Sequence, residues 1–215
     1  MRIVLLGLPG AGKGTQAQSL AWRLGIPFVS SGDLFRHHQS QGTELGVLAK
    51  GYMERGELVP DQVTIRMTLD RISEKDCQKG FILDGFPRTF EQAKALDEAL
   101  EDDPLDCAVY IKIGKDELVR RLSGRLSCRK CRALFQRDAL DSTVQCPVCA
   151  GELYQRADDE PDVVRTRIQV QLPGLTQLTD YYSQQDKLVE VDGEQGVDQV
   201  SEAALEAISR YAPIS

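Results

Sequence analysis

A glycine-rich turn near the start of the chain constrains the fold more than any other feature. An apolar run over Ile3 to Leu6 comes first, the segment GLPGAGKGT occupies residues 7–15, and a helical pattern continues over Thr15 to Leu24. Glycines allow a turn whose backbone N–H groups point inward, and the positive N-terminal end of the helix adds to them. A turn that binds nothing is the alternative, but the strand before it and the helix after it favour a phosphate-binding loop.

Two side chains of this loop have the chemistry that a triphosphate requires. Lys13 offers a mobile ammonium to the β and γ phosphates, and Thr15 is placed to bind phosphate or to help order Mg²⁺. In the usual pattern Ser or Thr follows the lysine directly, whereas Gly14 intervenes here. The loop alone does not distinguish a regulatory switch from a motor or a kinase.

Short apolar runs alternate with helical patterns along the rest of the chain, which predicts an α/β fold with a parallel sheet covered by helices on both faces. Ligands then gather beyond the carboxyl ends of the strands. Two stretches, about 30–60 and about 124–159, interrupt the alternation and are interpreted as insertions, the second of them loop-like. The expected strands are Ile3 to Leu6, Phe28 to Ser30, Phe81 to Leu83, Ala108 to Ile113 and Leu188 to Val191, and the expected helices are Thr15 to Leu24, Phe90 to Leu100, Asp116 to Leu122, Val163 to Tyr182 and a last one after Val197.

The charge of the chain limits its partners. A net charge of −7 and a pI near 5.0 disfavour nucleic acid and anionic membranes, so an anionic ligand has to be small and held by a focused site. The N-terminus lacks the pattern of a secretory signal, and no apolar run approaches the ~18 residues of a membrane span. We therefore expect a cytoplasmic protein.

Four of the six cysteines form two Cys-x-x-Cys pairs, Cys128 with Cys131 and Cys146 with Cys149, separated by fourteen residues. This spacing is typical of a closed, structural zinc site that takes no part in chemistry. A redox-active dithiol and a nucleic-acid-binding zinc ribbon are the alternatives. Cys77 and Cys107 are expected to be buried as small apolar side chains.

Two polar motifs follow the second and third expected strands. In Ser30-Ser31-Gly32-Asp33-Leu34-Phe35-Arg36, Ser31 or Asp33 is expected to cap a helix, and Arg36 can meet a phosphate one turn later. Asp84 ends the third strand, where a carboxylate can orient the waters around Mg²⁺. Gln92 can read a base edge because its amide both donates and accepts.

The loop at residues 7–15 and the string Asp84-Gly85-Phe86-Pro87-Arg88 resemble the corresponding motifs of the adenylate kinase family, and the resemblance extends from Met1 to about Asp192. It implies a P-loop NTPase-type parallel five-stranded sheet flanked by helices. It also implies a core of residues 1–29, 60–123 and 160–215, an AMP-binding helical insertion at 30–59 and a zinc-containing lid at 124–159. Ser31 stands where the family commonly has Thr, and the lid lacks the Asn-Pro-Pro run often seen in it.

The resemblance also implies roles for individual residues. Catalytic roles fall to Lys13, Asp84, Arg88, Arg125, Arg156 and Arg167. ATP is expected to contact Gly10, Ala11, Gly12, Lys13, Gly14, Thr15, Arg121, Arg125, Leu134, Phe135 and Gln195. AMP is expected to contact Ser31, Arg36, Glu57, Leu58, Val59, Gly85, Phe86, Pro87, Arg88, Gln92, Arg156 and Arg167. Zinc is expected to bind Cys128, Cys131, Cys146 and Cys149.

The predicted activity is reversible, Mg²⁺-dependent phosphoryl transfer between ATP and AMP, which yields two ADP, in a monomer. A GTP donor or another nucleoside monophosphate acceptor remains an alternative within the same class. A different class is a nucleotide-binding switch whose zinc module docks a partner. A switch has no need of a second set of phosphate-binding arginines, so the arginines favour the kinase.

Overall fold

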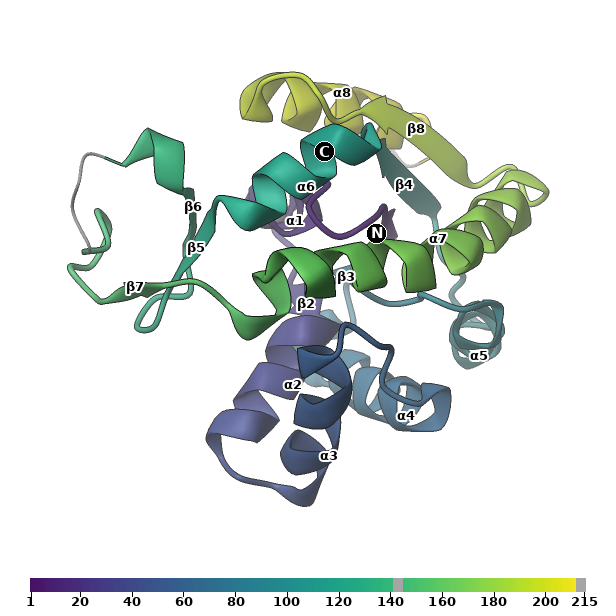
Figure 1. Ribbon diagram of the computed structural model, residues 1–215. Helices are drawn as coiled ribbons and strands as arrows, with labels where there is room; N and C mark the ends of the chain where they lie inside the picture. The colour runs from purple at the N-terminus through teal and green to yellow at the C-terminus, as the bar shows by residue number, and fades with distance from the viewer. Residues whose placement is uncertain (141–144, 212–215) are drawn as a thin grey trace.

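The computed structural model describes residues 1–140 and 145–211, and a five-stranded parallel sheet forms its centre (Figure 1). The strand order is β2-β3-β1-β4-β8, with Ile3 opposite both Ile82 and Cys107. The predicted α/β architecture and its five strands are thereby confirmed. The strands are β1 (Arg2–Leu6), β2 (Phe28–Ser30), β3 (Phe81–Asp84), β4 (Cys107–Lys112) and β8 (Leu188–Asp192).

Alternate side chains of β1 enter two hydrophobic cores, one on each face of the sheet, as the two-residue period of a strand requires. Ile3 and Leu5 pack in the core formed with α1 and α8, whereas Val4 and Leu6 pack in the core formed with α5, α6 and α7. Because both faces are covered, the strand is apolar throughout. The helices around the sheet are α1 (Lys13–Leu24), α4 (Asp61–Ile72), α5 (Phe90–Ala99), α6 (Lys115–Ser123), α7 (Pro161–Ser183) and α8 (Val197–Ile208).

Helices α2 (Ser31–Ser40) and α3 (Glu44–Glu54) form a pair that projects below the sheet in Figure 1. They pack closely, because a Cβ on Gly46 would lie 2.3 Å from the carbonyl carbon of His38. The side chain of Ser30 caps α2 by accepting a hydrogen bond from the backbone N–H of Asp33. The prediction that Ser31 or Asp33 supplies the cap is therefore wrong. Ser31 is buried and donates to the carbonyl of Gly85 instead.

The segment that holds the paired cysteines contains a small antiparallel sheet in the order β6-β5-β7, and it projects to the left in Figure 1. The strands are β5 (Arg125–Cys128), β6 (Leu134–Gln136) and β7 (Leu153–Tyr154). The loop-like interpretation of residues 124–159 is wrong for these strands, which are two to four residues long. Residues 141–144, part of the stretch between the cysteine pairs, lie outside the described residues.

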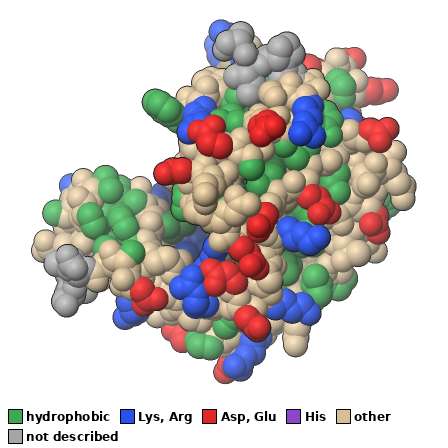
Figure 2. All heavy atoms as spheres, turned by 90° about the horizontal axis from the view of Figure 1, so that it is seen from above, with side chains coloured by type: hydrophobic (Ala, Val, Ile, Leu, Met, Phe, Trp, Pro, Cys, Tyr) green, Lys and Arg blue, Asp and Glu red, His purple; other side chains and the backbone are tan. Residues whose placement is uncertain are grey.

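Cationic side chains lie in the hollow between this small lobe and the main body (Figure 2). A cavity of about 450 Å³ lies between α2 and α3 on one side and the β5 and β7 strands on the other.

Cys77 and Cys107 are 1% and 0% exposed, as predicted, and burial raises the pKa of Cys107 to about 12. Within the part of the chain that the structure describes, no helix is both long enough and apolar enough to cross a bilayer.

Candidate active site

The glycine-rich turn connects β1 to α1 in the conformation that a phosphate-binding loop requires. Gly10 and Gly12 have φ values of 90° and 87°, a region that other residues rarely adopt. A Cβ on Gly10 would also lie 2.9 Å from Cγ of Leu122, so the turn packs directly on α6. A glycine-rich turn at the N-terminus of a helix is an anion-binding geometry.

Lys13, the first residue of α1, folds back across this turn. Its ammonium group donates to the carbonyls of Gly7 at 2.8 Å and Leu8 at 3.1 Å. Burial lowers the pKa of Lys13 to about 8; Asp84 opposes this shift, and Arg88 adds to it. An anionic ligand beside the ammonium would relieve both the desolvation and the repulsion between cations.

Asp84 lies beside the start of α1. It ends β3, where it pairs with Leu5 of β1 and Ser30 of β2 in the sheet register. A Cβ on Gly14 would lie 3.5 Å from a carboxylate oxygen of Asp84. The structure therefore brings together the carboxylate and the first turn of α1, which also carries the exposed Thr15.

A cavity of about 60 Å³ opens between α2, the end of β3 and α7. It holds the cationic side chains of Arg36, Arg88 and Arg167 together with the carboxylate of Asp158. Nine of the residues predicted to bind AMP line it: Ser31, Arg36, Glu57, Leu58, Val59, Gly85, Arg88, Gln92 and Arg167. We call this space the acceptor cavity.

The remaining three predicted AMP residues lie elsewhere. Phe86 is fully buried in the core, and Arg156 lines the larger cavity between α2, α3 and β5. Pro87 lines a smaller cavity of about 20 Å³, together with Gly7, Leu8 and Gln171. Lys13 and Arg88 both line this smaller cavity, so the phosphate-binding turn and the acceptor cavity share a boundary.

Buried carboxylates hold the arginines that surround this boundary. Arg125 donates from Nε and Nη2 to the two oxygens of Asp159, which is 0% exposed. Arg167 donates to the carbonyl of Asp158 at 2.7 Å and to a carboxylate oxygen of Asp159 at 3.2 Å. The bidentate pair fixes the guanidinium group of Arg125 in direction as well as in place.

The cationic groups at the site are crowded. Burial and the nearby Arg167 lower the pKa of Arg88 to about 10, and burial together with Arg36 lowers the pKa of Arg156 to about 10. Arg156 also donates from Nε to the hydroxyl of Ser127 at 2.8 Å. An arrangement of cations that repel one another in the free protein is suited to multiply charged anions.

The other residues predicted to contact ATP do not gather around one cavity. Arg121 donates to Glu117, and its Nη1 lies near the turn, 4.0 Å from where a Cβ on Gly12 would stand. Leu134 and Phe135 lie half-buried on β6, and Gln195 lies in the loop after β8, where it donates to Asp192 at 3.4 Å. These last three residues line none of the three cavities above, as far as the described residues define them.

The four paired cysteines come together in the small lobe. Their sulfur atoms all lie within 4.8 Å of one another. Backbone N–H groups of Cys131 and Lys130 point at the sulfur of Cys128, and these N–H donors lower its pKa to about 6. A Cβ on Gly151 would lie 3.0 Å from that sulfur, so the turn fits closely around it. The donor set and the geometry suit a tetrahedral metal ion.

Comparisons with known proteins agree with this geometry. The protein family described as "Adenylate kinase" matches residues 5–187 of the chain. An adenylate kinase of Alkaliphilus oremlandii is 50% identical and covers 93% of this chain and 94% of its own length. An adenylate kinase of Salinispora tropica is 48% identical over 99% of this chain and all of its own. The chain belongs to the adenylate kinase family.

Some residues at the site of this adenylate kinase family member carry no signal in the sequence. Asp159 holds two arginines, but no sequence motif marks it, because its partner Arg125 is 34 residues away. Asp61 bonds to Gln92 across 31 residues, another distance at which a sequence pattern carries no signal. Further residues of the acceptor cavity that were not predicted are Gly32, Phe35, Met53, Gly56, Thr64, Asp158 and Gln171.

Proposed function

We propose that the protein transfers a phosphoryl group reversibly between ATP and AMP and so forms two molecules of ADP. The observation that carries the proposal is the cavity that Lys13 and Arg88 line together. A donor phosphate on the glycine-rich turn and an acceptor phosphate at Arg88 would then meet at a common boundary. A nucleotide-binding switch has no use for that second cationic site.

The residues act by placing and neutralising phosphates. Lys13 and the N–H groups of the turn would hold the donor phosphates, while Arg36 and Arg88 would hold the acceptor phosphate. Arg125, Arg156 and Arg167 would stabilise the charge that is shared during transfer. The acceptor phosphate is itself a nucleophile near neutral pH, so we propose no general base.

Mg²⁺, when it is bound with the donor, neutralises phosphate charge and orients the leaving group. Asp84 and Thr15 would position it, since the carboxylate lies beside the first turn of α1. Gly10, Ala11, Gly12 and Gly14 would contribute backbone contacts to the donor phosphates. We further propose contacts of ATP with Arg121, Leu134, Phe135 and Gln195, and contacts of AMP with Phe86, Pro87 and Arg156.

The domain organisation of the chain is part of the same proposal. Residues 1–29, 60–123 and 160–215 form the core, residues 30–59 bind the nucleoside monophosphate, and residues 124–159 form a lid. Zinc on Cys128, Cys131, Cys146 and Cys149 would tie the lid strands together without contacting substrate. We also expect a cytoplasmic monomer that acts on free nucleotides rather than on nucleic acid or membranes.

A substrate panel tests the proposal. Purified protein with Mg²⁺ is given ATP or GTP as donor and AMP, GMP, CMP or UMP as acceptor, and diphosphate formation is measured by chromatography. We expect turnover with ATP and AMP, and Arg88→Ala to reduce it more than 100-fold with little change in the melting temperature. The exposed Arg66→Ala, on α4, serves as the control. Binding of ATP with no AMP-dependent turnover would overturn the kinase assignment in favour of a switch.

A further inference from the structure

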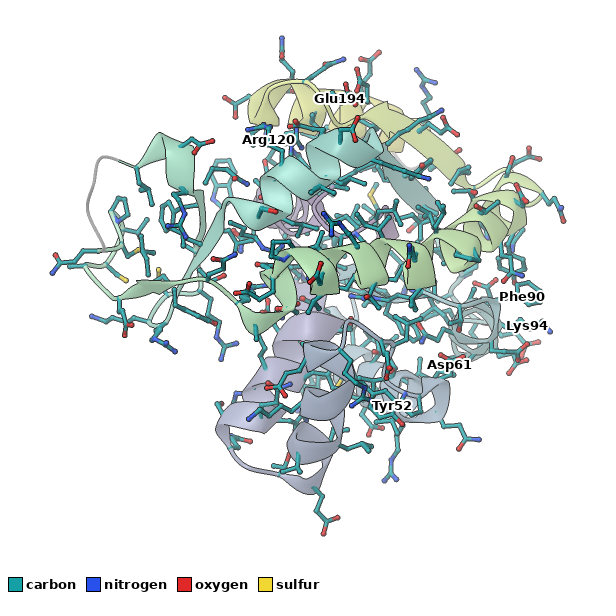
Figure 3. All side chains as sticks on the ribbon, viewed as in Figure 1. Tyr52, Asp61, Phe90, Lys94, Arg120 and Glu194 are labelled. Atoms are coloured by element: carbon teal, nitrogen blue, oxygen red, sulfur yellow. The ribbon has the colours of Figure 1, made fainter. Side chains whose placement is uncertain are left out.

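Asp61 connects the first turn of α4 to the first turn of α5, which begins after the loop at residues 85–89 (Figure 3). One of its carboxylate oxygens accepts a hydrogen bond from the hydroxyl of Thr89 at 2.9 Å. The other accepts one from the side-chain nitrogen of Gln92 at 2.7 Å. Asp61 does not line the acceptor cavity, whereas Gln92 does.

The amide group of Gln92 is held at both of its ends. Its oxygen accepts a hydrogen bond from the backbone N–H of Arg88 at 2.8 Å, and its nitrogen donates to Asp61. A carboxylate can only accept, and a backbone N–H can only donate. Rotation of the amide by 180° would therefore place its oxygen against the carboxylate of Asp61 and its N–H groups against the backbone N–H of Arg88.

This fixed orientation has a consequence for a ligand in the acceptor cavity. An amide nitrogen has two donors and an amide oxygen two lone pairs, so Gln92 has capacity for one further bond of each kind. A 6-aminopurine presents an acceptor at N1 and a donor at its amino group, whereas a 6-oxopurine presents a donor at N1 and an acceptor at its oxygen. An amide that is free to rotate could match either base, but an amide held in one orientation matches only one.

We propose that Asp61 is a positioning residue that gives the acceptor site its preference for 6-aminopurines over 6-oxopurines, by preventing rotation of the Gln92 amide. The inference rests on the proposed function, in which Gln92 reads the acceptor base. The backbone N–H of Arg88 is one restraint, and Asp61, which bears a charge, is the stronger one.

A role confined to helix stability makes a different prediction. The hydroxyl of Thr89 caps α5 by accepting from the backbone N–H of Gln92 at 3.2 Å, and it also donates to Asp61. Loss of that hydroxyl weakens the cap and one bond of Asp61 but leaves the bond from Asp61 to Gln92. The two bonds of Asp61 can therefore be tested separately.

The experiment measures kcat/KM for AMP and for IMP, with saturating ATP and Mg²⁺, in the full-length protein. We expect Asp61→Ala to reduce the ratio of the AMP value to the IMP value by roughly tenfold, since a hydrogen bond to a charged group is lost. Asp61→Asn should keep the ratio within about threefold, because its carbonyl can still accept from Gln92. Thr89→Val should lower the melting temperature and leave the ratio unchanged. Asp70→Ala, an exposed carboxylate on the same helix, is the control for charge.

A ratio within twofold of the unmodified protein in Asp61→Ala would overturn the inference, and so would an equal fall of the ratio in Thr89→Val. Asp61→Ser provides the same comparison where the alanine variant does not fold. Gln92→Leu separates this inference from the proposed function. If Gln92→Leu leaves KM for AMP unchanged, the base-reading role itself fails; if it raises KM while Asp61→Ala leaves the ratio intact, only the role of Asp61 fails.

Discussion

Asp159 is a fully buried carboxylate that serves two guanidinium groups, those of Arg125 and Arg167. Removing a charge from water is costly, and such a group is tolerated only where ionic and hydrogen-bond partners replace the lost water. The hydrogen bonds from Arg125 occupy both carboxylate oxygens. Asp159 therefore sets the direction of two arginines that the proposed reaction uses.

Asp159→Asn should lower the free energy of unfolding by about 3 kcal/mol, because two buried cations lose the charge that they share. Urea denaturation at pH 7 measures the change. Asp162→Asn is the matched control, since Asp162 pairs with Arg165 at the exposed surface and should cost less than about 0.5 kcal/mol. Equal effects of the two variants would show that Asp159 contributes no more than a surface pair.

The neighbouring Asp158 makes the free energy of unfolding depend on pH. Burial raises the pKa of Asp158, but Arg167 and Arg125 outweigh that effect and hold the pKa below its ordinary value of 3.8. A carboxylate with a depressed pKa stabilises the fold above its unfolded pKa, and that contribution is lost as the pH falls through the folded value. The difference in unfolding free energy between the unmodified protein and Asp158→Asn should therefore be constant from pH 7 to about 5 and shrink below about pH 4. Urea denaturation from pH 7 to pH 3 checks this, and a difference that grows on acidification would contradict it.

At the scale of helices and strands, the elements with a strong local pattern were predicted and those without one were not. Most strands of the central sheet are short apolar runs, although exposed acidic residues interrupt β8, and the glycine-rich turn has a spacing that few other structures share. Helix α4 is not predicted because the apolar residues over 63–69 alternate with polar ones, which is the two-residue period of a strand rather than that of a helix. The strands β6 and β7 have two or three residues each, too few for a two-residue period to appear.

Candidate site residues also divide into those that lie in a local sequence motif and those that do not. Lys13, Asp84 and Arg88 lie in contiguous motifs, which mark them as candidates. Lys13 and Arg88 line one cavity, and Asp84 lies beside the first turn of α1. Asp61 and Asp159 act through side chains more than thirty positions away in the sequence. A single sequence carries no record of such pairs, because they form where α4 packs on α5 and where Arg125 of β5 meets the turn at residues 157–159 before α7.

The cysteine cluster should hold the small lobe together through its metal. The lobe buries few apolar side chains, so we expect the bonds of the proposed zinc ion to its cysteine ligands to supply most of the stability of the lobe. We expect about one zinc per chain by elemental analysis, and a loss of at least half of it in Cys146→Ser. Hydrogen exchange should then accelerate in residues 125–136 and 153–154, while the strands of the central sheet keep their protection.

Cys77→Ala is the control for this prediction, since Cys77 is buried outside the cluster. It should keep its zinc and the slow exchange of the small lobe. Full zinc content in Cys146→Ser, or exchange that accelerates across the whole chain, would contradict a metal whose effect is local.

At the scale of the whole molecule, a chain with a net charge of −7 concentrates cations at one place. The arginines around the acceptor cavity are suited to small, multiply charged phosphates. The helix pair α2 and α3 and the small lobe face each other across a cavity of about 450 Å³. Arg36 and Arg156 approach that cavity from opposite sides.

Binding of both nucleotides should draw these two parts together, because phosphates between Arg36 and Arg156 would attract both cations and closure would exclude water as a competing acceptor. Spin labels on Val47→Cys and Glu152→Cys, two exposed positions, report the distance between the helix pair and the small lobe by pulsed electron paramagnetic resonance. The native thiols would not compete, since Cys77 and Cys107 are buried and the other four would bind zinc. We expect a distance shorter by roughly 5 Å or more, well above rotamer-scale motion, with ADP and Mg²⁺ at saturation.

AMP alone should move only the helix pair. The distance between labels on Val47→Cys and Lys187→Cys, the latter on the core, should then shorten in AMP. The distance between labels on Glu152→Cys and Lys187→Cys should stay fixed. Distances that remain the same in every nucleotide state would show that the arginines reach the phosphates without closure.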